Sequence, residues 1–122
     1  MKALFTTLAA AALLAACASV PAPSTKSADG ILTGPNGHAL YVFSEDKTAG
    51  QSACNDTCAA NWPPLAVSGS ASAQGDYTVI NRAGGAKQWA FKGKPLYYFV
   101  GDKKPGDKNG HGLGGMWSLA KP

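Results

Sequence analysis

The residues best suited to chemistry are three cysteines and two histidines. Cys54 and Cys58 enclose three residues, a spacing that favours a structural disulfide contributing roughly 2 kcal/mol in the chain-entropy model. The spacing is not C-x-x-C and Ala59 follows, which gives no support to haem attachment, and two cysteines alone cannot complete a zinc site. The alternatives are redox cycling of this pair, or copper(I) held by both thiolates and a histidine.

A second candidate site is the Gly-rich stretch 102–115. Asp107, Asn109 and His111 are spaced like the first ligands of a calcium loop, in which oxygens two residues apart converge on one cation. His111 stands where a third oxygen ligand is wanted, no Glu follows, and three nearby lysines oppose a dication. The stretch is therefore expected to be a turn without a metal, and no cofactor is predicted. An alternative copper set is His38, His111 and Met116.

Composition argues against two functional classes. No G-x-S-x-G and no metalloprotease helix motif is present, and only the two histidines titrate near neutral pH, so an enzyme is not expected. The chain has 11 basic and 7 acidic residues, but the lysines are scattered and no nucleic-acid-binding motif accompanies them. The positive charge indicates a solvated surface that faces anionic components of the cell envelope.

The first sixteen residues form an export signal. Met1-Lys2 supplies a positive start, and Ala3 to Ala16 is uncharged and too short to span a bilayer. The run ends in Leu14-Ala15-Ala16-Cys17, which resembles a bacterial lipobox whose Cys17 is acylated after cleavage. An ordinary secretory signal cleaved near Cys17 is the alternative. An exported chain meets oxidising conditions, which favour the Cys54–Cys58 disulfide.

The mature chain is therefore predicted to be attached to a membrane through Cys17. Ala18 rather than Asp follows this cysteine, which favours the outer membrane of a Gram-negative bacterium by resemblance to lipoprotein sorting. Residues 17–28 are small, polar and Pro-containing, and they are expected to form a flexible tether. The folded domain is expected over residues 29–122.

Hydrophobic periodicity predicts an all-β domain. Short β-rich runs separated by Gly, Pro and Asn replace any sustained helical pattern. Residues 31–43 form a predicted hairpin around Asn36-Gly37, and residues 77–91 form a second around 83–86. Further strands are expected over 96–100 and 116–119, with a helical turn over 58–61 before Pro63-Pro64.

An internal repeat divides this domain into two related hairpin-like units. Residues 37–46 match residues 93–102, and each copy carries the motif Y-x-F-x-x-D. The motif residues are Tyr41, Phe43 and Asp46 in the first copy, and Tyr97, Phe99 and Asp102 in the second. Period two places Tyr and Phe on one strand face, where they form the core, and the Asp accepts backbone N–H groups in the following turn. The alternative is a ligand site made of the two hydroxyls and the two carboxylates.

These motifs resemble a family of secreted-repeat lipoproteins named for Y-x-(F/W/Y)-x-x-D. Further similarity lies in Cys54-x-x-x-Cys58-Ala59-x-x-Trp62-Pro63-Pro64-Leu65, in Lys87-Gln88-Trp89, and in residues 101–107. The resemblance covers about residues 29–122. It implies a cell-envelope lipoprotein, and it brings no enzymatic activity and no catalytic residue.

Two functions follow as hypotheses. The first is a non-enzymatic binding or structural module that meets an envelope partner through loops 44–53 and 101–115. The second is an accessory of envelope electron transfer or copper handling through Cys54, Cys58 and the histidines.

Overall fold

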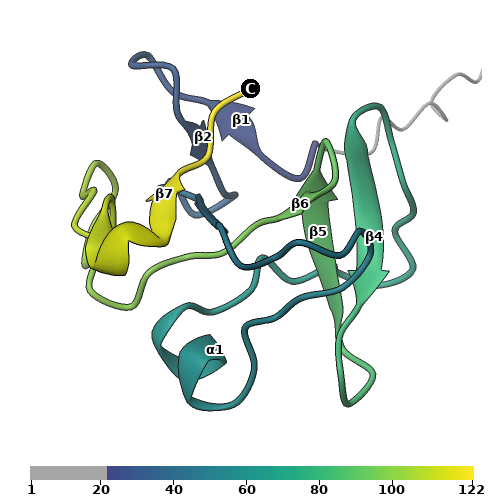
Figure 1. Cartoon of the computed structure of the whole chain (residues 1–122). Helices are drawn as coiled ribbons and strands as arrows, with labels where there is room; N and C mark the ends of the chain where they lie inside the picture. Colours follow the sequence, from purple (N-terminus) through teal and green to yellow (C-terminus); the bar gives the residue numbers. More distant parts are fainter. Residues whose placement is uncertain (1–21) are drawn as a thin grey trace, which may run out of the picture.

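The computed structural model describes residues 22–122 and consists of short antiparallel strands with one short α-helix (Figure 1). This arrangement confirms the predicted all-β fold. The predicted signal peptide, residues 1–16, and the predicted acylation site, Cys17, lie outside the described residues. Within residues 22–122 no helix combines the length and the apolar character that crossing a membrane requires.

The folded region begins earlier than the sequence predicted. Strand β1 (Thr25–Lys26) pairs with strand β2 (Leu32–Thr33). Ser24 is buried and its hydroxyl is hydrogen-bonded to the hydroxyl of Tyr77. The predicted tether of residues 17–28 is therefore wrong at its C-terminal end, because a backbone ladder and a buried contact fix residues 24–26.

The first predicted hairpin is present. The Gly37 amide donates to the Gly34 carbonyl at 2.8 Å and closes the turn, and the Leu40 amide donates to the Leu32 carbonyl at 3.0 Å. The chain then continues into strand β3 (Tyr41–Phe43), which pairs with the last strand, β7 (Trp117–Leu119). The motif strand of the first repeat thus lies beside the C-terminal strand of the second.

The second predicted hairpin is also present, as strands β4 (Tyr77–Asn81) and β5 (Lys87–Phe91). Strand β6 (Lys94–Pro95) adds to β5, and the strand expected over 96–100 is only an isolated pairing at Tyr97. Tyr97 pairs with Tyr41 on one side and with Pro64 on the other, and on that second side Pro63 and Pro64 have no N–H to donate, so the ladder cannot continue there. Helix α1 (Thr57–Asn61) confirms the predicted helical turn, and a 3₁₀ helix, η2 (Leu113–Gly115), precedes β7.

Each half of the chain places one extended segment between two segments of the other half, an arrangement that we call strand exchange. We call residues 22–69 the first half and residues 70–122 the second. Ala120, which follows β7 in the second half, bonds to Leu32 and Leu40 of the first hairpin. Leu65 of the first half bonds to Trp89 in β5 and to Leu96, just after β6. The four bonds are Leu32 N to Ala120 O at 2.9 Å, Ala120 N to Leu40 O at 2.8 Å, Trp89 N to Leu65 O at 2.9 Å, and Leu65 N to Leu96 O at 2.9 Å.

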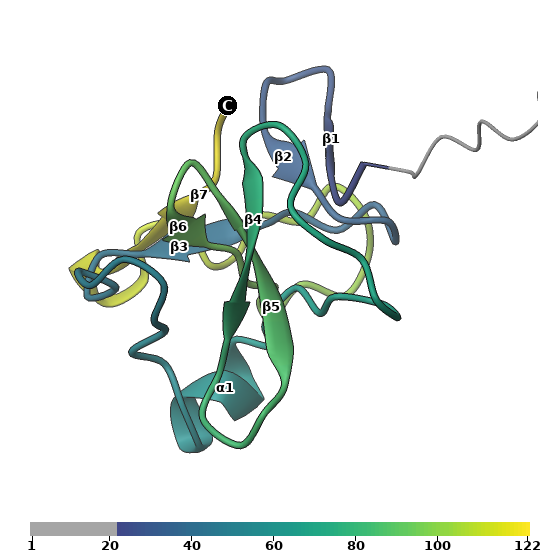
Figure 2. The ribbon, with the colours of Figure 1, turned by 90° about the vertical axis from the view of Figure 1, so that its right-hand side faces the viewer.

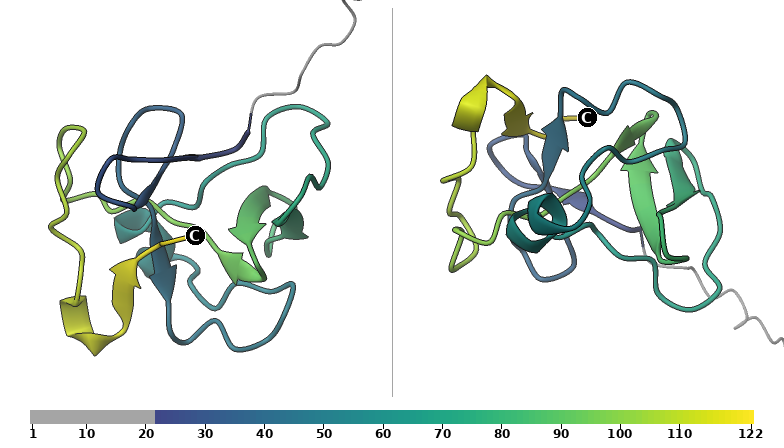
Figure 3. Two further views of the ribbon diagram at one scale, coloured as in Figure 1. Left: turned by 90° about the horizontal axis from the view of Figure 1, so that it is seen from above. Right: turned by 60° about the horizontal axis from the view of Figure 1, so that its bottom comes forward.

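The exchanged strands enclose two apolar clusters. One contains six buried side chains from the exchanged segments: Leu32, Leu40, Leu65, Trp89, Leu96 and Ala120. The other is mainly aromatic and contains Tyr41, Trp62, Tyr97 and Trp117 together with Cys54. Figures 2 and 3 show β3 and β7 side by side with the β4–β5–β6 sheet next to them, while α1 lies at one end of the molecule. The repeated motifs meet in the aromatic cluster.

Candidate functional site: the crossed Tyr–Asp pairs

The two motif tyrosines bond to the motif aspartates of the opposite repeat. The Tyr41 hydroxyl donates to Asp102 Oδ2 at 2.7 Å, and the Tyr97 hydroxyl donates to Asp46 Oδ2 at 2.7 Å. Both tyrosines are fully buried, and Asp102 is only 6% exposed. Hydrogen bonds to an ionised acceptor are stronger than neutral ones, and they gain further in a dry interior.

The tyrosine backbones are paired in the same reciprocal way. The Tyr41 amide donates to the Tyr97 carbonyl at 2.8 Å, and the Tyr97 amide donates to the Tyr41 carbonyl at 3.0 Å. Exchanging the two repeats therefore reproduces the same contacts, so an approximate two-fold axis passes between these residues.

The second carboxylate oxygen of each aspartate holds its own loop. Asp46 Oδ1 accepts the Ala53 amide at 2.6 Å, and Asp102 Oδ1 accepts the Asn109 amide at 2.8 Å, seven residues further along in each case. The predicted role of the aspartates as acceptors in the following turn is confirmed. Their bonds to the opposite tyrosines were not predicted.

Four aromatic rings stack in one column at the centre of the molecule. Trp62 and Trp117 are nearly parallel, with centroids 3.8 Å apart. Phe43 stacks on the outer face of Trp117 at 4.2 Å, and Phe99 stacks on Trp62 at 4.3 Å. The motif tyrosines meet the indoles edge-on, Tyr41 at Trp62 and Tyr97 at Trp117, with centroids 5.4 and 5.1 Å apart. Each repeat thus supplies rings that pack on those of the other.

Gly110 is required by this column. A Cβ at Gly110 would lie 2.8 Å from Trp62 Cη2 and 3.0 Å from Tyr41 Cε1, too close for either ring to remain in place. We expect Gly110→Ala to lower the free energy of unfolding by about 1–3 kcal/mol, the usual cost of overpacking. Urea denaturation measures this loss, and the cost should shrink in a Trp62→Phe background. An equal cost in both backgrounds would contradict the steric explanation.

A polar network extends from the crossed pair of Tyr97 and Asp46. The sequence did not predict this network. Arg82 Nη1 donates to Ser52 Oγ at 2.9 Å and to Gln88 Oε1 at 2.7 Å, and Nη2 donates to the Cys54 carbonyl at 2.6 Å. Gln88 is fully buried and donates to the Leu96 carbonyl at 2.8 Å. The only available signal was that Arg82 is the single arginine among eleven basic residues.

Three hydrogen bonds of this network run in one direction, from Arg82 towards Asp46. Tyr97 gives its proton to Asp46, so the 2.7 Å contact between Ser52 Oγ and Tyr97 requires Ser52 to be the donor. Ser52 in turn accepts from Arg82. Two hydroxyls therefore link the guanidinium of Arg82 to the carboxylate of Asp46.

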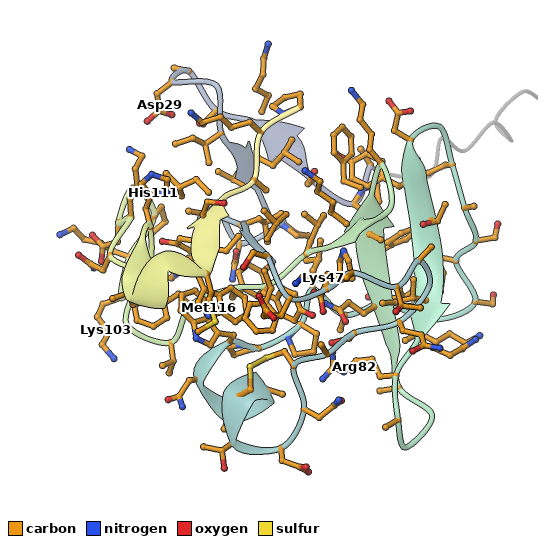
Figure 4. The ribbon with its side chains drawn as sticks, viewed as in Figure 1. Asp29, Lys47, Arg82, Lys103, His111 and Met116 are labelled. Atoms are coloured by element: carbon orange, nitrogen blue, oxygen red, sulfur yellow. A yellow bond between two sulfur atoms is a disulfide. The ribbon has the colours of Figure 1, made fainter. Side chains whose placement is uncertain are left out.

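The predicted disulfide between Cys54 and Cys58 is confirmed. Cys54 is fully buried in the aromatic cluster, and Cys58 lies in helix α1. Figure 4 shows Arg82 close to this bond and His111 well away from it, on the side of the molecule that carries Lys103. In the second repeat, Gly110 occupies the position that corresponds to Cys54 at the repeat offset of 56 residues.

The residues of the calcium-like loop make separate local contacts. Asp107 Oδ2 accepts the Lys103 amide at 2.9 Å and the Lys104 amide at 3.2 Å. The Asn109 amide bonds to Asp102, and His111 Nδ1 accepts the Leu119 amide at 3.1 Å. Each of these three residues therefore stabilises a turn or a strand end.

The two remaining members of the alternative copper set lie in different surroundings. His38 meets Tyr98 edge-on, with ring centroids 6.5 Å apart, and Met116 is 41% exposed. Over residues 22–122, no group of three or more His, Cys, Asp or Glu side chains lies close enough together to hold a metal ion.

Because the motif tyrosines are buried, the stability of the fold is expected to decrease at high pH. Burial, reinforced by Asp102, holds the pKa of the Tyr41 hydroxyl well above its ordinary value of 10.0. Burial also raises the pKa of Tyr97, and Asp46 contributes in the same direction. The folded chain thus binds these protons more tightly than the unfolded chain.

We therefore expect the free energy of unfolding to fall as the pH rises above 10. The unfolded chain releases its tyrosine protons there while the folded chain retains them, which costs about 1.4 kcal/mol per pH unit for each tyrosine. The urea midpoint, followed from pH 9 to about 11.5, gives the slope of the free energy of unfolding against pH. The double variant Tyr41→Phe/Tyr97→Phe should show a shallower fall, and an unchanged slope would refute the assignment to these two residues.

Double-mutant cycles test the crossed pairs themselves. We expect Tyr41→Phe and Asp102→Asn each to cost about 1.5–3 kcal/mol, with a coupling energy of 0.5 kcal/mol or more, roughly the range for contacting residues. The cycle of Tyr97→Phe with Asp46→Asn should give a similar coupling. Tyr41→Phe combined with Asp46→Asn is the control and should be additive, because those two residues are not bonded to each other.

Comparison with known families agrees with this two-fold arrangement. A family model described as a secreted repeat of unknown function matches residues 24–66 and, a second time, residues 78–121. The chain belongs to this family. No curated protein and no solved structure matches it.

The two matched segments correspond to the two halves that exchange strands. The first segment contains β1, β2, β3, α1 and Leu65, and the second contains nearly all of β4 together with β5, β6, β7 and Ala120. The first match begins at Ser24, the first residue with a buried polar contact, rather than at the predicted Asp29. One secreted repeat is therefore half of this fold.

Proposed function

We propose that this secreted-repeat protein is a non-enzymatic binding or structural module of the bacterial cell envelope. The observation that carries the proposal is the crossed pairing, because it uses the motif hydroxyls and carboxylates to join the repeats. A Tyr or Asp already bonded inside the core is poorly placed to act on a substrate. The loops that follow each motif, 44–53 and 101–115, remain the candidate surfaces for an envelope partner.

The proposed attachment is an acyl group on Cys17 in the outer membrane of a Gram-negative bacterium. The Leu14-Ala15-Ala16-Cys17 sequence supports acylation, and the description of the family as secreted agrees with export. Seven residue steps separate Cys17 from Ser24, which is held by a buried contact, and they reach at most about 25 Å when fully extended. A domain attached in this way stays close to the membrane, nearer than a tether of residues 17–28 would allow.

The attachment is tested by labelling cells with radioactive palmitate and separating their membranes. We expect label in the wild-type chain and in the outer-membrane fraction, and none in Cys17→Ser, which should be soluble after export. Acylation that persists in Cys17→Ser would refute the assigned site. Recovery of the wild-type chain only from the inner membrane would refute the assigned membrane.

The binding role is tested by photo-crosslinking in intact envelopes. A photoreactive residue at the exposed positions Thr48 or Pro105 is expected to capture a discrete partner, whereas one at Ala83, in the β4–β5 turn, is the control. The same products from all three positions, or none from either loop, would refute the proposed loop surface.

A further inference from the structure

An apolar pocket lies where strands β3 and β7 approach the end of the β5–β6 hairpin. Its volume is about 320 Å³, near the lower end of the range for small-molecule sites. The apolar residues that line it are Val42, Phe91, Leu96, Leu119, Ala120 and Pro122, of which Leu96 and Ala120 are buried. Strand β3 pairs with β7 and contacts β6, and all three strands contribute residues to the pocket (Figure 2). None of the crossed Tyr–Asp residues contributes to the pocket.

Three lysines also line the pocket: Lys92, Lys94 and Lys121. No Asp or Glu lines it, and the ion pairs found within residues 22–122 use other lysines. The Nζ atom of Lys92 lies 5.4 Å from the centroid of the Phe91 ring, which places this charge beside the apolar surface. Three like charges at a low-dielectric concavity attract an anion.

The backbone at Lys92 provides a second, independent observation. Phe91 pairs with Lys94, so Lys92 and Gly93 form a two-residue hairpin turn, and both have positive φ, 50° and 84°. Such turns favour Asn, Asp or Gly at the first position, and a lysine there is strained. Lys92 thus occupies a position where backbone conformation favours Asn, Asp or Gly. Strained residues of this kind are found at functional sites.

We propose that this pocket binds a single-chain anionic amphiphile, an alkyl carboxylate or alkyl phosphate, in monomeric form. The alkyl chain would lie against Val42, Phe91 and Leu119, which are half-buried, and the anionic head would face the lysines. Lysine acts as a point charge and does not require the two-pronged geometry that arginine reads, so both anionic groups fit. The concave shape accommodates one chain rather than a flat bilayer. The inference stands apart from the proposed envelope function.

The test uses the whole mature chain carrying Cys17→Ser, titrated with decanoate and followed by ¹H–¹⁵N NMR. We expect shifts confined to residues 91–96, 118–121 and β3. Decanol, which has the chain without the charge, should bind more weakly, and acetate, which has the charge without the chain, should not bind. Equal affinity for decanol and decanoate, or shifts centred elsewhere, would overturn the proposal.

Charge variants test the role of the lysines. Replacing Lys92, Lys94 and Lys121 together by Gln should weaken decanoate binding by about threefold for each lysine, as expected for partly exposed ion pairs. The control changes Lys26, Lys87 and Lys103 to Gln; it removes the same total charge outside the pocket and should leave the affinity within about twofold. Equal weakening by both sets would show that net charge rather than the pocket is responsible.

Lys92→Asn separates binding from folding. Asparagine suits the positive φ, so we expect a higher urea midpoint together with about threefold weaker decanoate binding. Retained affinity in this variant would overturn the role of Lys92. Lysine-dependent binding to phosphatidylglycerol vesicles without binding of decanoate would assign the three lysines to a membrane surface and overturn the proposal.

Discussion

Residues 22–69 and residues 70–122, when produced separately, are expected to remain unfolded and to fold when mixed. Each half lacks hydrogen-bond partners that the other half supplies, although the β4–β5–β6 sheet lies within the second half. Ala120 joins Leu32 to Leu40, Leu65 joins Trp89 to Leu96, and β3 pairs with β7 of the second half. Each half alone would expose half of both apolar clusters and leave one crossed hydroxyl and one carboxylate without a partner. Burying such groups unpaired costs more than one half can recover.

The experiment places a protease site in the exposed loop 68–70 of the intact chain. After cleavage the two fragments should co-elute and keep the dispersed NMR spectrum of the uncut protein. Denaturation and separation should give two fragments with unfolded spectra, and mixing them should restore the original spectrum. A dispersed spectrum from either isolated fragment would contradict the dependence of one half on the other.

Trp62→Ala is expected to remove most of the stability of the protein. Trp62 stacks on Trp117 and Phe99 and meets Tyr41 edge-on, so its loss opens the centre of the aromatic column. Replacing a buried Trp or Phe by Ala typically costs about 3–5 kcal/mol. Domains of this size have a free energy of unfolding near the lower end of roughly 5–15 kcal/mol. The variant should therefore be marginally folded at 25 °C.

Urea denaturation gives the free-energy change, and circular dichroism gives a signature specific to the column. Two parallel indoles 3.8 Å apart should show exciton coupling, which Trp62→Ala removes and Trp89→Phe leaves intact. Phe91→Ala, which truncates a half-buried ring outside the column, is the control and should cost less than Trp62→Ala. A cost below about 1 kcal/mol for Trp62→Ala would contradict the central role of the column.

Local features of this fold could be predicted from the sequence because neighbouring residues determine them. The Asn36-Gly37 turn, the 77–91 hairpin and the short helix before Pro63-Pro64 each depend on backbone preferences within a few residues. The alternation of Tyr and Phe in the motif likewise predicted a core face. The disulfide followed from the spacing of Cys54 and Cys58 and an expected oxidising compartment.

The exchange of strands could not be predicted in this way. The two repeats have similar sequences, so Leu65 and Ala120 are each compatible with either hairpin on hydrophobic pattern alone. Tyr41 and Tyr97 have the same ambiguity, since Asp46 and Asp102 follow identical spacing. Choosing between a bond within a repeat and a bond across repeats requires the three-dimensional arrangement.

The Arg82 network was missed for a different reason. Gln88 lies on β5 and Arg82 directly follows the neighbouring strand β4, whereas Ser52 comes from a distant loop, so no spacing in the sequence relates all three. The start of the domain was placed too late because Ser24 and Thr25 are small polar residues. Ser24 is buried through its contact with Tyr77, which is distant in sequence, and Thr25, which is exposed, is held by its pairing with β2 across a turn.

The strand exchange also affects the order in which the chain can fold. The first hairpin is complete only when Ala120 is available to join Leu32 and Leu40. During synthesis, therefore, the N-terminal half cannot close its core until Ala120 has left the ribosome, unlike a chain whose first unit folds independently. This delay keeps the polypeptide unfolded, which suits its passage through a narrow translocation channel. The core then forms on the far side of the membrane that contains this channel.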